Sequence, residues 1–467
     1  MAVAGVAVAG VVVAGVVGAG GVVVWVMRAA CHTKCTRTRA SGDDGGVHST
    51  ARASIALPWD AEIADPVGAI ASARAELGDT FVVASGGVDH LFVFSPAGVR
   101  SFYALDERLA SKGIADWKLM ARKLPDEMFA GRRTLPHDLF GRRAGAAYLG
   151  HLAAAIAVEF DALGDAGTVD VFDLTRRLGH RMGLASWGGQ APEPGERFEE
   201  LVRALDVLDG ADAFVRPEAM AAIAANGKRN ERAALARLEA MLAETVRARD
   251  GASPRSDLFA DIVGRWHDVA EPERSVGIAR DVVLVHIGSM SNLFAALGWT
   301  IVDLLRHPAV FARLRDGETE LAERCALEST RLAQRSIMLR WVVRPVEVEL
   351  ETRRVRCDPG TMIATLLPLT NGSAAPGLDR YDPDRWDRRR LRDGDQLAAR
   401  ELVTTFGHGA HTCPAQPFSL AAITAATVAF ISTFDLERQF TVAEPRVGQI
   451  GGVARSAEPC EVGYRRR

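Results

Sequence analysis

A single cysteine follows a glycine-punctuated turn in the C-terminal part of the chain. The octet Phe-Gly-His-Gly-Ala-His-Thr-Cys ends at Cys413, and an apolar run over 418–434 with a helical pattern follows it. Gly407 and Gly409 let the backbone approach a bound group closely and adopt positive φ angles, where a Cβ atom would clash. The N-terminus of the following helix offers unpaired N–H groups and a positive dipole end, which favour thiolate over thiol. A thiolate held in this way is a candidate axial ligand to haem iron, and the alternative is a buried structural cysteine.

The octet resembles the haem-binding loop of the cytochrome P-450 family, Phe-x-x-Gly-x-x-x-Cys, and every fixed position of that pattern is present. The resemblance implies a haem b cofactor whose iron takes the thiolate of Cys413 as its axial ligand. It also implies that Phe406 belongs to the cofactor-binding loop and that His411 contacts a haem propionate. The chain departs from the family directly after the cysteine, where Cys-Pro-Ala replaces the usual Cys-x-Gly and Ala415 adds a methyl group beside the haem.

A second motif, Glu328-Ser-Thr-Arg331, matches the family's Glu-x-x-Arg and lies in a segment with a helical pattern, 318–334. Side chains three residues apart share one face of a helix, so the carboxylate and the guanidinium can meet. Downstream, Arg385 lies in a stretch that resembles the family's Pro-Glu-Arg-Phe region. The resemblance implies that Glu328, Arg331 and Arg385 form a partly buried ion network behind the cysteine loop, because an arginine can bond two acceptors at once.

The apolar periodicity predicts a mainly α fold with small β-sheets. Two strands, 80–84 and 91–95, flank the pair Gly86-Gly87 and read as a hairpin. Alternating residues over 341–357 predict further strands before a turn at Pro359-Gly360. Helices are predicted over 116–129, 142–163, 199–208, 217–249 and 276–305. This order resembles the cytochrome P-450 fold from about Pro58 to the C-terminus.

The long central helix, 276–305, decides which chemistry the resemblance implies. In oxygen-activating family members, a Gly-x-acid-Thr stretch bends this helix over the haem, and its threonine and carboxylate help to deliver protons to dioxygen. Counting back from the His-Pro pair at 307–308 places Asn292 at the threonine position and Ser291 at the acid position. The register that is anchored on the preceding glycine places Ser291 at threonine and Met290 at the acid. Neither register supplies a carboxylate, and we prefer the first because Asn292 and Trp299 are seven residues apart, as in the bile-acid and prostacyclin-synthase branches.

Two mechanisms follow from an amide at this position, because an amide is a poor acid but can orient water or bind a peroxide oxygen. In the first, a haem-thiolate monooxygenase inserts one oxygen atom of O2 into a hydrophobic, sterol- or lipid-like substrate. Its electrons come from a ferredoxin or an NADPH-dependent reductase, and its protons come through Ser291, Asn292 and ordered water. In the second, a lipid hydroperoxide or endoperoxide is isomerised or dehydrated without reductant. A non-catalytic haem-binding protein is the third alternative, and Asn292 that only satisfies a helix carbonyl is the plain structural interpretation. The monooxygenase leads because most family members hydroxylate.

Haem propionates need cations, and the resemblance points to candidates besides His411. Arg340 ends a stretch, 336–340, that looks most like sterol-demethylase relatives, in which an arginine has this role. A third contact is expected near Arg132, Arg133 and His137, where the family's usual Trp-x-x-x-Arg is absent. The sequence leaves these three as alternatives.

Composition fits a large enzyme. The net charge of -3 and the pI near 6.4 argue against a nucleic-acid partner, which usually requires a strongly basic balance. Six scattered cysteines do not form a disulfide framework pattern, which fits a reducing compartment. No internal repeat or long linker divides residues 58–467, so we expect one catalytic domain there.

The N-terminal end is unusual. Residues 1–27 contain no charged side chain and lead into a basic stretch, a length that can span a bilayer core. Basic residues on the C-terminal side predict a transmembrane helix that leaves the catalytic domain in the cytoplasm. A translated segment upstream of the true start, with a soluble cytoplasmic protein, is the alternative. Residues 28–57 are predicted to be a polar linker.

Overall fold

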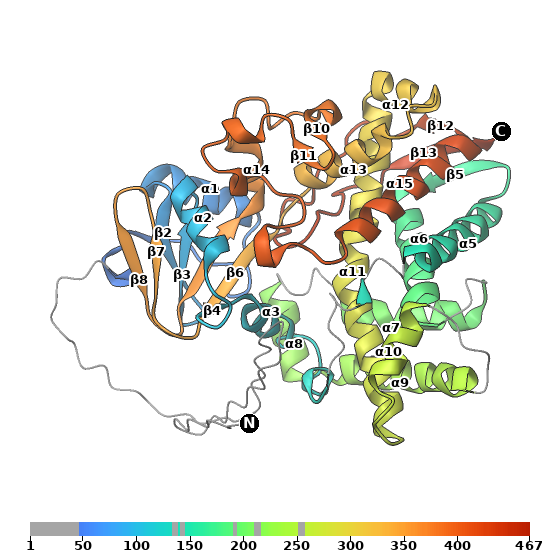
Figure 1. Cartoon of the computed structure of the whole chain (residues 1–467), viewed down its shortest axis with the longest axis horizontal. Coiled ribbons are helices and arrows are strands. Elements are labelled where there is room, and N and C mark those ends of the chain that lie inside the picture. The colour runs from blue at the N-terminus through green and yellow to red at the C-terminus, as the bar shows by residue number, and fades with distance from the viewer. Residues whose placement is uncertain (1–45, 133–138, 141–144, 190–193, 210–215, 251–256) are drawn as a thin grey trace.

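The computed structural model of the chain describes residues 46–132, 139–140, 145–189, 194–209, 216–250 and 257–467. The expected membrane anchor at 1–27 and two of the candidate propionate contacts, Arg133 and His137, lie outside these ranges. In Figure 1, one large group of strands lies at one side of the molecule and most of the long helices lie at the other, where a smaller group of strands lies near the C-terminus. The mainly α architecture with small sheets that the periodicity predicts is therefore confirmed.

The largest sheet joins strands that lie far apart in the described chain. Its strand order is β1-β2-β3-β9-β6-β4. These strands span Arg52–Ala53, Thr80–Ser85, Val88–Val93, Met362–Leu366, Ile337–Val342 and Ala110–Ser111. Alternate residues of β2 point to opposite faces, so that Val82 joins one hydrophobic core while Phe81 and Val83 join another.

The predicted hairpin is confirmed. β2 and β3 pair antiparallel from Thr80 opposite Val93 to Ser85 opposite Val88. The two linking glycines have φ angles of 58° and 73°, which both central residues of a tight two-residue hairpin turn require.

The predicted linker over 28–57 is wrong in its C-terminal part, because residues from Gly46 onward belong to the fold. Arg52 and Ala53 form β1, which pairs in parallel with β2. Val47 and Leu57 are 5% and 0% exposed and each joins a core. A two-residue edge strand and isolated apolar side chains leave little periodic signal in a polar stretch, so the sequence did not reveal them.

The long helices pack around one central helix, α11 (Glu273–Arg306), which runs through the helical side of the molecule in Figure 1. The largest hydrophobic core contains side chains of α11 and of the helices around it. These are α5 (Gly145–Leu163), α6 (Val171–Trp187), α7 (Glu196–Asp209), α9 (Arg229–Asp250), α10 (Leu258–Arg265) and α15 (Gln416–Thr433). The remaining helices are α1 (Pro66–Leu77), α2 (Pro96–Ala104), α3 (Lys112–Met120), α8 (Pro217–Ala225), α12 (Pro308–Arg315), α13 (Leu321–Leu332) and α14 (Leu367–Ser373).

Three smaller sheets complete the described fold. β12 (Phe434–Arg438), β13 (Glu461–Arg466) and β5 (Ala166–Asp170) form one of them. β7 (Val346–Glu349) pairs with β8 (Arg354–Cys357), and β10 (Trp386–Asp387) pairs with β11 (Arg390–Leu391). The alternation over 341–357 thus corresponds to the end of β6 followed by β7 and β8.

Two predicted helices are interrupted. The segment 217–249 is two helices, α8 and α9, because Gly227 and Lys228 have φ angles of 64° and 57° and break the α-helical backbone. The segment 116–129 contains the end of α3 and a separate 3-10 turn, Asp126–Phe129. Pro125 precedes that turn, and a proline disfavours helical backbone at the residue before it.

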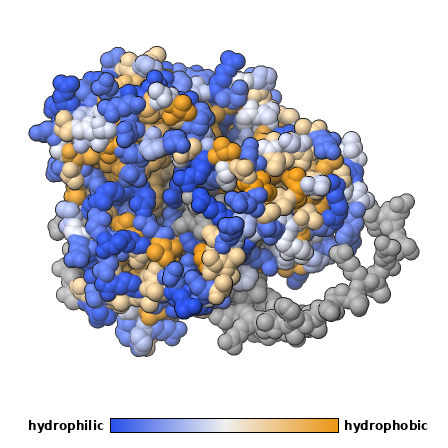
Figure 2. All heavy atoms as spheres, turned by 180° about the vertical axis from the view of Figure 1, so that it is seen from behind, coloured by the Kyte–Doolittle hydropathy of each residue, from blue (hydrophilic) through white to orange (hydrophobic). Residues whose placement is uncertain are grey.

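Within the described residues, α11 and α15 are long and apolar enough to cross a membrane by length and composition. Their most apolar windows are 67% and 44% buried inside the protein, and both helices contribute to the main core. Core helices meet the same criteria, so we assign both to the interior of the fold. Figure 2 shows that hydrophilic side chains cover most of one face of the molecule, with apolar side chains in scattered groups.

Candidate functional site

The cysteine loop folds as a closed turn directly before α15. The backbone N–H of Cys413 donates to the carbonyl of Phe406 at 2.7 Å and joins the two ends of the octet. Gly407 has a φ of 82°, and a Cβ atom at this position would lie 2.4 Å from the carbonyl oxygen of His411. Gly409 also has a positive φ, 58°. The structure therefore requires glycine at 407 for two separate reasons, close backbone approach and left-handed backbone.

The thiol of Cys413 is partly buried at the end of this loop. Burial raises its pKa, and the backbone N–H groups of Ala415 and Gln416 and the charge of Lys112 act in the opposite direction. The expected helix N-terminus effect is thus present, but burial outweighs it in the free protein. A metal ion that binds the sulfur would deprotonate it.

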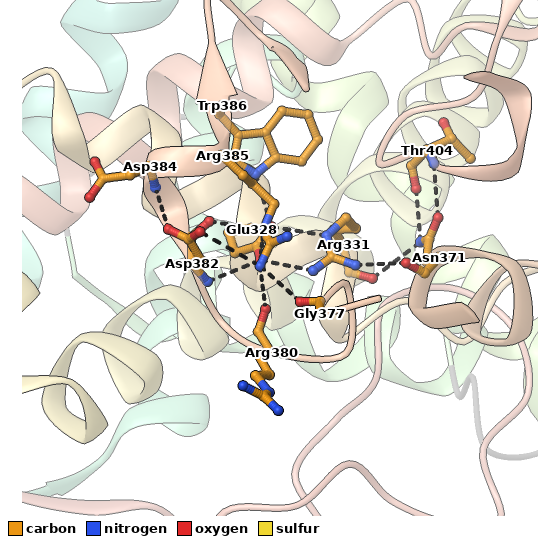
Figure 3. A network of polar contacts seen from close by, with 10 residues as sticks. All are labelled: Glu328, Arg331, Asn371, Gly377, Arg380, Asp382, Asp384, Arg385, Trp386 and Thr404. Atoms are coloured by element: carbon orange, nitrogen blue, oxygen red, sulfur yellow. Dashed lines mark hydrogen bonds and ion pairs between the residues drawn. The ribbon is translucent and has the colours of Figure 1, made fainter. Parts of the chain in front are cut away.

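A buried ion network lies behind the loop, as the two arginine motifs predict (Figure 3). Glu328 and Arg331 on α13 are both 0% exposed and form a two-point ion pair with N–O distances of 2.9 and 2.8 Å. Arg385 Nε lies 2.8 Å from Glu328 Oε1. Trp386 Nε1 and the backbone N–H of Asp382 also donate to this carboxylate, at 2.9 and 3.1 Å. The predicted cluster of one glutamate and two arginines is confirmed.

Asn371 on α14 connects the ion network to the cysteine loop (Figure 3). Arg331 Nη1 donates to the Asn371 carbonyl at 2.8 Å, and Asn371 Nδ2 donates to the carbonyl of Thr404 at 2.9 Å. Asn371 Oδ1 accepts from the Thr404 N–H at 2.8 Å, and Thr404 Oγ1 accepts from the N–H of Gly407 at 2.7 Å. No motif marks Asn371 in the sequence, so only its contacts reveal that it supports the loop.

Arg340 on β6 and His411 of the cysteine loop lie together. Arg340 is 0% exposed, and its Nη1 donates to the carbonyls of Leu105 and Ala110 at 3.0 and 2.7 Å. Its Nη2 contacts the ring Nε2 of His411, and its buried Nε has no partner in the described residues. Burial, and next the charge of Arg340, lower the pKa of His411 to about 4. The guanidinium of Arg340 and the imidazole of His411 thus face each other, and the Nε donor of Arg340 beside them has no partner among the described residues.

Two other basic side chains are candidates for propionate contacts. The sequence did not indicate Lys112, and Arg132, one of the predicted candidates, lies at the surface. Lys112, at the start of α3, is close enough for its charge to lower the pKa values of both Cys413 and His411. The residues around Lys112 in the sequence do not predict that it lies near Cys413 and His411. The fold creates this proximity, because β4, directly before Lys112, leads the chain to the loop. Arg132 is exposed and forms an ion pair with Asp268 instead.

An uncovered stretch occurs in the middle of α11. Gly288 and Asn292, one turn apart on one face, are exposed, although most of this helix is buried. A Cβ atom at Gly288 would have no neighbour within 4 Å. The open space beside this face suits a bound group that approaches the backbone closely.

Both candidate catalytic side chains on α11 contact the segment before β13. Asn292 Oδ1 accepts from the N–H of Val453 at 2.9 Å, so this amide oxygen pairs with another segment rather than with its own helix. Ser291 Oγ accepts from Arg455 Nη2 at 3.2 Å. Asp209 at the end of α7 lies 3.4 Å from the same Nη2, which brings a carboxylate that the α11 stretch lacks.

The residues present fit a haem. Cys413 offers a soft sulfur ligand, and Arg340, His411 and Lys112 offer donors and positive charge for two carboxylate groups. The unpaired Nε of Arg340 would gain an acceptor from such a carboxylate, which removes the cost of a buried unsatisfied donor. A flat ring system would cover the bare face of α11 at Gly288.

Comparison with known proteins gives relatives at low identity. No protein-family model matches the chain. Sterol 14alpha-demethylase of Mycolicibacterium vanbaalenii is 27% identical over 192 residues, which are 36% of this chain and 40% of that protein. The human 24-hydroxycholesterol 7-alpha-hydroxylase is 20% identical over 433 residues, 86% of this chain and 90% of that protein.

Two solved structures match most of the chain. The retinoic-acid-bound cyanobacterial CYP120A1 has a TM-score of 0.66 at 14% identity and covers 85% of this chain and 94% of its own. The heme domain of cytochrome P450DA has a TM-score of 0.68 at 18% identity and covers 90% and 98%. At these identities the two structures establish that the chain shares their fold.

Proposed function

We propose that the chain is a haem-thiolate monooxygenase of the cytochrome P-450 family that acts on a hydrophobic, sterol- or lipid-like substrate. The observation that carries the proposal is the closed cysteine loop, held from behind by the buried Glu328 network and flanked by Arg340 and His411. A surface cysteine or a structural thiol needs no such support.

Several residues in and around the loop would share the task of holding the cofactor. Cys413 would bind the iron, while Arg340, His411 and Lys112 would bind the propionates. Phe406, partly buried against the main core, would keep the loop against the ring. Haem bound in this way supplies the activation of dioxygen for insertion of one oxygen atom into the substrate.

Ser291 and Asn292 would position water and protons beside the cofactor. Asn292 Oδ1 is held by Val453, which fixes the plane of the amide and leaves Nδ2 as a donor on the exposed side of α11. The hydroxyl of Ser291 accepts a hydrogen bond from Arg455 and can itself donate one to Asp209 or to a water molecule. These groups would orient ordered water, because neither is an acid at neutral pH.

The relatives support a sterol- or lipid-like substrate. Two of them are a sterol 14alpha-demethylase and a 24-hydroxycholesterol 7-alpha-hydroxylase, and one solved relative in the fold holds retinoic acid. A monooxygenase of this kind needs a ferredoxin or an NADPH-dependent reductase as electron donor. We place its catalytic domain in the cytoplasm, attached to a membrane by residues 1–27.

A second candidate function rests on the absence of a carboxylate in the α11 stretch around Asn292. The exposed amide could bind a peroxide oxygen of a lipid hydroperoxide or endoperoxide, which the enzyme would rearrange without reductant. A screen of sterols, fatty acids and hydroperoxides by spectral binding and turnover, with and without a reductase, separates the two functions. We expect product only when reductant and dioxygen are both supplied. Turnover of a hydroperoxide without reductant would replace the monooxygenase by the isomerase.

A further inference from the structure

Arg455 places a positive charge against the middle of α11, beside the exposed face at Gly288 and Asn292. Its Nη2 donates to Ser291 Oγ at 3.2 Å and lies 3.4 Å from Asp209 Oδ2. The Arg455 side chain is 31% exposed and that of Asp209 is 15% exposed. The ion pair between Arg455 and Asp209 is thus only partly exposed to solvent.

The contacts of this guanidinium leave some of its donors without a partner in the described residues. Within the described part of the chain, the hydrogen bonds of the Arg455 side chain involve Nη2, so Nε and Nη1 remain accessible for a ligand. Asn292 likewise uses its Oδ1 toward Val453 and keeps the two N–H donors of Nδ2. The Arg455 guanidinium and the Asn292 amide therefore both keep N–H donors without a partner in the described residues.

Basic groups surround the Asp209 carboxylate. Burial raises the pKa of Asp209, and the charges of Arg455, His180 and Lys123 act against this rise. Lys123 is only 3% exposed. Arg455 and Lys123 therefore both act on the Asp209 carboxylate, and Arg455 contacts it directly.

We propose that Arg455 is a specificity-determining residue that binds the carboxylate of a hydrophobic substrate at the middle of α11. This assignment rests on the proposed function and narrows its substrate class to hydrophobic acids. A guanidinium suits the task because its planar fork can donate two parallel hydrogen bonds to one carboxylate. A few polar groups in an otherwise apolar site fix the orientation of a ligand, and here they would fix which carbon faces the cofactor.

Asp209 has a matching part. In the free protein it holds Arg455 over Ser291, and in the complex it competes with the substrate for the same guanidinium. Its removal should therefore tighten acid binding, while removal of Arg455 should weaken it. A purely structural ion pair would give neither response.

The test compares a long-chain fatty acid with the fatty alcohol of the same chain length, using calorimetric titration of the full-length, haem-loaded protein. We expect the acid to bind more tightly than the alcohol. Arg455→Gln should weaken acid binding about 10- to 100-fold, because a charge-assisted hydrogen bond is lost, and should leave alcohol binding nearly unchanged. Arg465→Gln, which removes an exposed arginine of β13, is the control and should change neither affinity.

Asp209→Asn provides a second, opposite readout and should tighten acid binding without affecting the alcohol. Equal affinity for acid and alcohol in the wild-type protein, or an Arg455→Gln variant that keeps the preference for the acid, would overturn the assignment. The reduced carbonyl spectrum of the same samples reports Cys413 ligation separately. A thiolate-type spectrum without acid preference would thus reject the role of Arg455 and leave the proposed function standing.

Discussion

The carboxylate of Glu328 is buried in the interior, and N–H groups of four residues contact it. Arg331, Arg385, Trp386 and the backbone of Asp382 all direct N–H groups at its two oxygens. A buried ion pair adds little net stability compared with a well-packed apolar pair, but loss of one partner leaves an uncompensated charge. The network therefore acts as a rigid support for the cysteine loop, whose disruption is costly.

Glu328→Ala should lower the free energy of unfolding by about 3–5 kcal/mol and yield protein with little haem, because Arg331 is left buried and unpaired. Urea unfolding and the ratio of haem to protein absorbance measure the two effects. Glu347→Ala, which removes an exposed partner of Arg354, is the matched control and should change stability by less than about 1 kcal/mol. Normal haem content in Glu328→Ala would show that the network does not support the loop.

Asn292 distinguishes the two mechanisms at a single side chain. If the chain is a monooxygenase, Asn292→Thr should preserve or improve the coupling of reductant use to product, since a hydroxyl also positions water. If the amide binds a peroxide oxygen, loss of this donor should lower reductant-free hydroperoxide turnover by about 10²–10³. Product formed per reductant consumed, measured beside hydroperoxide turnover in the same variant, decides between them.

At the scale of elements, α11 and α13 share a buried carboxylate that couples stability to pH. Asp303 on α11 is 6% exposed, and burial raises its pKa to about 6, while the nearby Ser329 hydroxyl and the charge of Arg306 act in the opposite direction. The unfolded chain has an ordinary aspartate pKa near 4, so the native state binds this proton more tightly. This contribution to stability is therefore present below about pH 4 and is lost as the pH rises to about 6.

Asp303→Asn removes the proton linkage and keeps the shape of the side chain. We expect the variant to be more stable than the wild-type protein at about pH 7.5, by up to about 3 kcal/mol, and to lose the advantage near pH 4. Urea midpoints across this range measure the difference, and Asp387→Asn, at an exposed position of β10, is the control. A variant that is less stable at every pH would mean that the Asp303 charge stabilises the fold.

The elements were predictable where the periodicity is long and unbroken. The range 276–305 predicted α11 to within a few residues, and the glycine pair at 86–87 correctly predicted the β2–β3 hairpin. The prediction failed at 217–249, because the backbone at Gly227 and Lys228 breaks the helix without a proline to signal the break.

The candidate site was predictable only in part. The resemblance correctly implied that Glu328, Arg331 and Arg385 come together. It named Arg340 and His411 as separate propionate contacts, and the structure places these two side chains together. Asn371 and Lys112 were missed because their roles arise from contacts across the fold. The roles of all the predicted site residues in cofactor binding or catalysis, Cys413, His411 and Arg340 included, remain predictions.

At the scale of the whole molecule, the site depends on segments that lie far apart in the sequence. Strands from residues 52–111 and 337–366 form one sheet, and Arg340 of this sheet reaches the loop that precedes α15. Because distant segments must come together before the loop is supported, we expect cofactor binding and folding to be coupled.

The N-terminal segment is a separate question for the whole molecule. Deletion of residues 1–27 should move the protein from the membrane fraction to the soluble fraction with normal haem content, because we expect the catalytic domain to lie C-terminal to this segment. Fractionation followed by haem quantification measures this outcome. A full-length protein that is already soluble would favour a start site downstream of this segment.

The central claim is that Cys413 binds haem iron as a thiolate. The carbon monoxide spectrum of the reduced protein tests it most directly, since the absorbance of the carbonyl adduct depends on the axial ligand. We predict a thiolate-type spectrum for the wild-type protein and its complete loss in Cys413→Ala, while Cys460→Ala, a buried cysteine before β13, keeps the spectrum. A thiolate-type spectrum that survives in Cys413→Ala would contradict the account.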